Sequence, residues 1–68
     1  MDAGKTGELI AARRKELGMS QEELALKANL NPAYFGQVER DLKCPTVDTL
    51  YKIASALDIS PAEFLRRL

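Results

Sequence analysis

The side chains with the clearest chemistry share one face of a helix predicted at about residues 32–40. The face turned away from Phe35 and Val38 carries Pro32, Ala33, Gly36, Gln37 and Arg40. Gln37 has the amide donor and acceptor that match N6 and N7 of adenine in the major groove. A recognition helix contacts base edges through its N-terminal residues, and small side chains there permit a close approach. This face predicts a DNA-reading surface, with Tyr34 beside it as a contact to a thymine methyl or a phosphate.

Gly36 is an unfavourable choice within this predicted helix. Glycine is up to about 1 kcal/mol less favourable than alanine in a helix interior. A close approach of the DNA to the helix backbone would explain the glycine, and so would close packing against another helix.

Positive charge flanks the same region. Arg40 and Lys43 lie in or next to the loop that follows the predicted helix, and Gln21 stands at the start of the helix before it. The N-terminus of a helix suits a phosphate. Arg13 and Lys15 add positive charge on the first predicted helix. Each of these residues alone is most simply a solvated surface residue, and only their combination indicates phosphate contacts.

Two opposite charges stand where apolar residues are expected. Arg14 follows Ile10 by four residues, and Glu39 follows Phe35 by four, so each charge lies on the apolar stripe of its helix. An unpaired buried charge would be costly, whereas a hydrogen-bonded pair is tolerated. We predict an Arg14–Glu39 ion pair that joins the first helix to the third; the alternative is that both side chains extend to solvent.

The elements that position these residues are all predicted to be helices. The first runs from Gly7 to Leu17 and is stopped by Gly18. The second begins at Ser20, where Ser20–Glu23 forms a capping box, and ends at Asn29, which tolerates the left-handed conformation.

The third predicted helix is capped by Asn31 and has Pro32 at its first position. Phe35, Val38 and Leu42 give it one apolar face. Thr46 caps the fourth, whose apolar residues are Val47, Leu50, Tyr51, Ile53, Ala54 and Leu57. The fifth follows Ser60 and Pro61 and contains Phe64, Leu65 and Leu68.

Composition excludes several classes of function. The chain has 68 residues, 10 basic and 10 acidic side chains, one cysteine and no histidine. This length predicts one domain, over residues 1–68. A single cysteine permits no intrachain disulfide, which favours a reducing cytoplasm, and without histidine no protein zinc site or Ser–His catalysis is expected. We expect no catalytic residue, cofactor, metal or small-molecule substrate, no signal peptide, and no contact with a membrane.

Some apolar residues remain after one core is filled. Tyr51, Phe64, Leu65 and Leu68 are candidates for a dimer interface, although we favour Tyr51, Phe64 and Leu65 as parts of the core. Leu26 is expected on the surface. Cys44 is expected to be a half-buried inert thiol, with a redox switch as the less favoured alternative.

Three motifs resemble the Cro/CI-type (XRE) helix-turn-helix family, and the match spans nearly the whole chain. They are Ser20-Gln21-Glu22-x-Leu24-Ala25, Val38-Glu39-Arg40 and the segment from Leu50 to Ile59. The resemblance implies a compact, all-α, five-helix, lambda-repressor-like DNA-binding domain, in which the second and third helices form the helix-turn-helix. Many members of the family act as dimers on palindromic operators.

The resemblance also implies roles for individual residues. Gln21 would contact a phosphate and brace a base-reading side chain, and Arg40 and Lys43 would contact phosphates. The residues that would face the bases or the groove wall are Pro32, Ala33, Tyr34 and Gln37. Family members commonly pair the residues at the positions of Arg14 and Glu39. They often have glycine at the positions of Asn29 and Asp41, and the acidic Asp41 is expected to weaken DNA binding slightly.

The leading functional hypothesis is a sequence-specific DNA-binding transcription regulator. It would be a small dimeric repressor in the cytoplasm, associated with the nucleoid when bound, that reads the major groove with residues 32–40. The alternative is a protein-interaction module on the same fold with little affinity for DNA, which the zero net charge and Asp41 favour. An enzyme has almost no support.

Overall fold

The computed structural model describes residues 3–67, with side chains from residue 6 onward. Within that range the chain forms five helices and no strand. They are α1 (Ala3–Glu16), α2 (Gln21–Lys27), α3 (Pro32–Glu39), α4 (Val47–Ala56) and α5 (Pro61–Arg67). The predicted all-α, five-helix fold is confirmed. The predicted start of the first helix at Gly7 is wrong, because α1 already begins at Ala3.

The helix starts follow from local hydrogen bonds to backbone N–H groups. Ser20 and Glu23 form the predicted capping box, and these bonds lower the pKa of the Glu23 carboxyl below its ordinary value. Asn31 accepts from the amides of Ala33 and Tyr34 at the start of α3. Thr46 caps α4 through the amide of Thr49. These three predicted caps are confirmed.

The first four helices end in the same way. A residue with positive φ follows each of them, namely Gly18, Asn29, Asp41 and Asp58, with φ between 59° and 68°. In each case the next residue donates its N–H to the carbonyl five residues before it, which is the Schellman arrangement. The left-handed conformation predicted for Asn29 is confirmed, whereas the two aspartates adopt it without having been predicted to.

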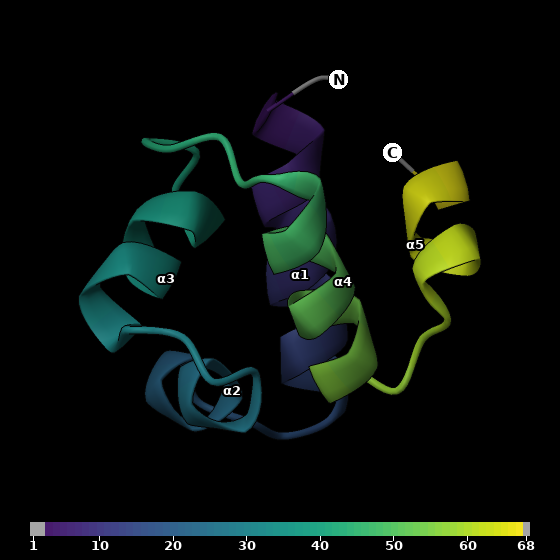
Figure 1. Cartoon of the computed structure of the whole chain (residues 1–68). Helices are drawn as coiled ribbons and strands as arrows, with labels where there is room; N and C mark the ends of the chain where they lie inside the picture. Colours follow the sequence, from purple (N-terminus) through teal and green to yellow (C-terminus); the bar gives the residue numbers. More distant parts are fainter. Residues whose placement is uncertain (1–2, 68) are drawn as a thin grey trace.

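The core contains at least one buried residue from every helix. Its largest apolar members are Ile10, Leu24, Phe35, Ile53, Leu57 and Phe64. Figure 1 shows α2 and α3 on one side of α1 and α4, and α5 on the opposite side. The helix α3 packs against both α1 and α2, so it is supported along the side that faces the core.

Several predicted burials are wrong. Leu42 was placed on the apolar face of the third helix, but α3 ends at Glu39 and Leu42 is 68% exposed. Tyr51 is 49% exposed, and Leu65 is exposed as well, so neither completes the core. Phe64 is buried as predicted, and Leu26 is exposed as predicted.

Two further predictions concern the chain's end and its thiol. Leu68 lies outside the described residues. Cys44 is exposed, not half-buried as predicted, because it lies in the loop between α3 and α4 while its neighbour Pro45 takes the buried position. None of the helices among residues 3–67 is both long and apolar enough to cross a membrane.

Candidate nucleic-acid interface

The helices α2 and α3 form a helix-turn-helix. The four residues between them have separate tasks: Ala28 is buried in the core, Asn29 turns the chain with φ 59°, Leu30 packs against the core, and Asn31 caps α3. The inner sides of the two helices are held by buried residues, among them Leu24 and Phe35. The outer side of α3 is therefore directed away from the body of the protein.

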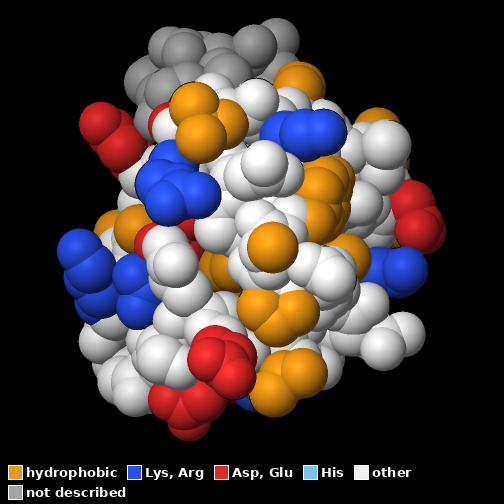
Figure 2. All heavy atoms as spheres, turned by 90° about the vertical axis from the view of Figure 1, so that its left-hand side faces the viewer, with side chains coloured by type: hydrophobic (Ala, Val, Ile, Leu, Met, Phe, Trp, Pro, Cys, Tyr) orange, Lys and Arg blue, Asp and Glu red, His pale blue; other side chains and the backbone are white. Residues whose placement is uncertain are grey.

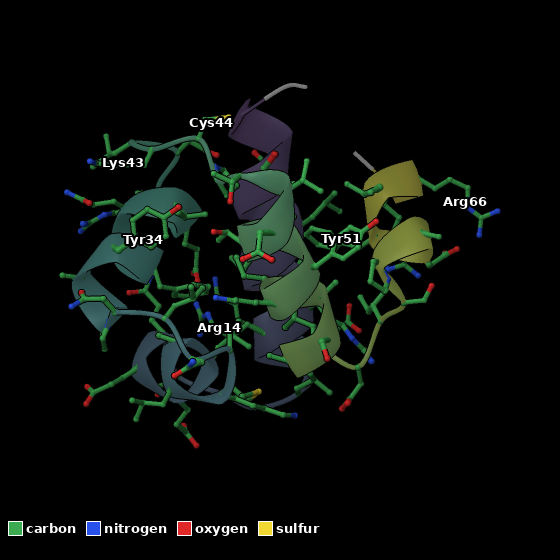
Figure 3. The ribbon with its side chains drawn as sticks, viewed as in Figure 1. Arg14, Tyr34, Lys43, Cys44, Tyr51 and Arg66 are labelled. Carbon is green, nitrogen blue, oxygen red and sulfur yellow. The ribbon has the colours of Figure 1, made fainter. Side chains whose placement is uncertain are left out.

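Most of the residues predicted to meet DNA lie on this outer side. Those exposed to solvent are Gln21, Pro32, Ala33, Arg40 and Lys43. Gln37 and Tyr34 are half-buried, and Tyr34 also packs against the core. Figure 3 shows Lys43 extending outward from the loop that follows α3. We call this predicted set the α3 outer face; its members come from the start of α2, from α3 and from the loop that follows α3.

Charge is distributed unevenly over this side of the molecule. Figure 2 shows basic side chains near the end of α3 and the loop that follows it, and acidic side chains around α2. The basic end contains Arg40 and Lys43, and the acidic end contains Glu22 and Glu23, all exposed. A zero net charge is therefore compatible with a local basic patch at one end of α3.

Arg13 was expected to add positive charge near this face, and the structure places it elsewhere. Its Nε donates to the carbonyl of Leu57 at 3.2 Å, and its Nη1 pairs with Glu16 at 3.2 Å. These contacts direct Arg13 toward the end of α4, so it does not belong to the α3 outer face.

The inner side of α3 is anchored to α1 by the predicted ion pair between Arg14 and Glu39. Nη2 of Arg14 lies 2.8 Å from Oε1 of Glu39, and its Nε donates to Oε2 at 3.1 Å. Nη1 donates to the carbonyl of Met19 at 2.7 Å. The two side chains are only 12% and 6% exposed. Such a two-point, largely buried pair fixes the orientation of α3 relative to α1.

A second anchor lies one turn from the start of α1. The N–H of Gly7 donates to Oδ1 of Asp41 at 3.1 Å. A Cβ at Gly7 would lie 2.3 Å from the carbonyl oxygen of Glu39, so only glycine permits this approach of the two backbones. This tie was not predicted, because it depends on contacts between residues 34 positions apart.

Asp41 was expected to weaken DNA binding slightly, as an acidic residue near the DNA backbone. Its carboxylate accepts the hydrogen bond from Gly7, on the side of the loop that faces α1. This hydrogen bond holds the carboxylate against the backbone of α1.

Gly36 has different surroundings from Gly7. A Cβ added there would meet two atoms within 4 Å, Nη2 of Arg40 and Oε1 of Gln21, each at 3.8 Å. This is an ordinary van der Waals separation, so close packing against another helix does not explain the glycine. The side chains of Gln21 and Arg40 come together above it, one from each helix of the helix-turn-helix.

These features define the class of protein. A short helix, a tight turn and a second helix with a free outer face, held from behind by a third helix, are the arrangement of a helix-turn-helix protein. Residues 10–64 match the family model described as helix-turn-helix. The chain belongs to this family, and it is a helix-turn-helix transcriptional regulator, not an enzyme.

Known proteins match nearly the whole length of this chain. The uncharacterized HTH-type transcriptional regulator y4dJ of Sinorhizobium fredii is 38% identical over 66 residues, which are 96% of this chain and 86% of that protein. The crystal structure of the restriction-modification controller protein C.AhdI from Aeromonas hydrophila superposes with a TM-score of 0.87 and 38% identity, over 93% of this chain and 96% of that one.

A third similarity concerns a structure that contains DNA. SinR, described as the master regulator for biofilm formation, has been solved in complex with DNA, and it superposes with a TM-score of 0.80 and 38% identity. The match covers 88% of this chain and 97% of that one. The SinR protein of Bacillus subtilis is longer, and the matched region spans half of its length.

Proposed function

We propose that this protein is a sequence-specific DNA-binding regulator, a small repressor that reads the major groove with α3. The observation that carries the proposal is the α3 outer face. It presents small residues at the start of α3, one long amide in the middle and basic residues at its end. The similarity to SinR, a protein solved in complex with DNA, supports the same reading.

The residues on this face have separate tasks in the proposal. Gln37 reads a base edge through its amide, and Pro32 and Ala33 allow α3 to enter the groove closely. Tyr34 contacts the groove wall from its half-buried position. Gln21, Arg40 and Lys43 bind phosphates, which fix the register of the protein on the duplex.

We further propose that two copies bind one palindromic operator. The longest extent of the Cα trace is 24 Å, whereas successive major grooves on one side of a duplex lie about 34 Å apart. One copy therefore reads one half-site, and a second copy is needed to read the next half-site. Tyr51 and Leu65 are exposed apolar residues available to an interface between copies.

The protein would act as a single domain over residues 1–68, in the compartment that holds its DNA, the cytoplasm. The helix-turn-helix fold can also serve as a protein-interaction module with little DNA affinity. The two acidic residues at the start of α2 and the zero net charge favour that second candidate.

A selection from random duplex DNA at low salt tests the proposal. The wild-type chain should enrich a palindrome, and Gln37→Ala should lose the preference at one base pair of each half-site. Ser55→Ala, on the exposed side of α4, is the control and should enrich the wild-type sequence. A folded wild-type chain that enriches nothing would favour the protein-interaction module.

A further inference from the structure

Gly36 stands where two candidate DNA-binding side chains meet. It lies in the middle of α3, and its position is buried although it belongs to the outer half of the helix-turn-helix. The atoms nearest to a Cβ at this position belong to Gln21 and Arg40. These two side chains cover the backbone of α3 at Gly36.

The geometry brings the two side chains together. Nη2 of Arg40 and Oε1 of Gln21 each lie 3.8 Å from the position of a Cβ at residue 36, so these two atoms are separated by no more than twice that distance. The amide nitrogen of Gln21 and the guanidinium of Arg40 are both hydrogen-bond donors, so each can donate to a phosphate group. The bond from the guanidinium is charge-assisted and is the stronger of the two.

The fold itself does not require this glycine. A methyl group fits beside both atoms at ordinary contact distance, and α3 would gain stability from alanine. A longer side chain would occupy the volume in which the ends of Gln21 and Arg40 now lie. The size of residue 36 therefore controls where these two side chains rest.

We propose that Gly36 is a positioning residue, whose small size seats Gln21 and Arg40 together on α3 so that both bind one DNA phosphate. This inference rests on the proposed function as a DNA-binding regulator. It goes beyond that function because it assigns a role to a residue that does not itself bind DNA.

Two variants at this position separate positioning from stability. Alanine and glutamine both favour helix over glycine, so Gly36→Ala and Gly36→Gln should remain folded and melt no lower than the wild type. Binding to the duplex selected by the wild-type chain is measured by fluorescence anisotropy over a series of salt concentrations. Gly36→Ala should bind within about twofold of wild type.

Gly36→Gln should bind at least about tenfold more weakly than Gly36→Ala. The slope of log affinity against log salt should fall by about 0.9, the amount for one phosphate contact. Equal binding by the two variants would overturn the proposal.

A double variant shows whether Gly36 acts through Arg40. If it does, Gly36→Gln should change the salt slope of the wild type but not that of Arg40→Ala. An undiminished effect in the Arg40→Ala protein would mean that residue 36 contacts DNA directly, and would overturn the proposal. A wild-type chain that binds no duplex would instead overturn the proposed function, and this inference with it.

Discussion

Gly7 and Gly36 both lie inside helices. Gly7 belongs to α1 and contacts the inner side of α3, whereas Gly36 belongs to α3 and lies on its outer side. A Cβ at Gly7 would lie 2.3 Å from a backbone carbonyl oxygen of α3, whereas a Cβ at Gly36 would have its nearest neighbours at 3.8 Å. The fold therefore requires glycine at position 7 but not at position 36. The inner side of α3 is fixed by close backbone contact and a buried ion pair, which leaves its outer side free for small and polar residues.

The largest effect should come from breaking the ion pair on the inner side. Arg14→Leu leaves the Glu39 carboxylate largely buried without its partner, and should lower the free energy of unfolding by about 3–5 kcal/mol. Arg66→Leu is the matched control, because Arg66 pairs with Glu63 on the exposed surface of α5 and such pairs contribute little. Thermal unfolding followed by circular dichroism measures both. An unchanged melting temperature in Arg14→Leu would show that α3 is not held by this pair.

A smaller loss is expected from Gly7→Ala. The added methyl group forces the start of α1 away from Glu39 and Asp41, at a cost of about 1–3 kcal/mol typical of overpacking. The gain in helix propensity from alanine is smaller than this cost. Denaturant unfolding should show a lower midpoint, and a midpoint above that of the wild type would contradict the close approach of the two backbones.

Gly36→Ala should have the opposite sign. Since the methyl group meets no atom closer than 3.8 Å, alanine should raise the free energy of unfolding by up to about 1 kcal/mol. The same denaturant experiment serves as the measurement. Destabilisation of Gly36→Ala would erase the contrast between the two glycines.

The two left-handed aspartates extend the comparison to the ends of α3 and α4. Asp58→Gly relieves a positive φ and loses only a weak ion pair to Lys27 on the surface, so it should stabilise the protein by up to about 1 kcal/mol. Asp41→Gly relieves the same strain but loses the hydrogen bond from Gly7, which offsets the gain. Equal stabilisation of the two variants would show that the bond between Gly7 and Asp41 contributes nothing.

Local signals in the sequence predicted the helices well. Ser20, Asn31 and Thr46 cap helices through residues two or three positions away, so the pattern of the sequence contains the whole interaction. The pairing of Arg14 with Glu39 could also be anticipated, because each charge interrupts an apolar stripe. These predictions needed no knowledge of how the helices pack.

The predictions that depended on packing were less successful. Leu42 has the spacing of a core residue, but Asp41 turns the chain out of the helix one residue earlier, and Leu42 is left exposed. Tyr51 is an apolar residue of α4, yet it is 49% exposed, and Figure 3 shows it pointing toward the side where α5 lies. The close contact at Gly7 joins residues far apart in the chain, so no local pattern reveals it.

Paired affinity measurements on the selected operator test most directly whether the α3 outer face reads base sequence. Gln37→Ala and Lys43→Ala are each measured on the operator and on single-base-pair variants of it. Gln37→Ala should lose about 1–3 kcal/mol on the operator and lose its preference at one base pair, whereas Lys43→Ala should weaken binding to all sequences alike and flatten the salt dependence. If Gln37→Ala keeps the wild-type ratio of affinities across all base-pair variants, α3 does not read sequence through Gln37.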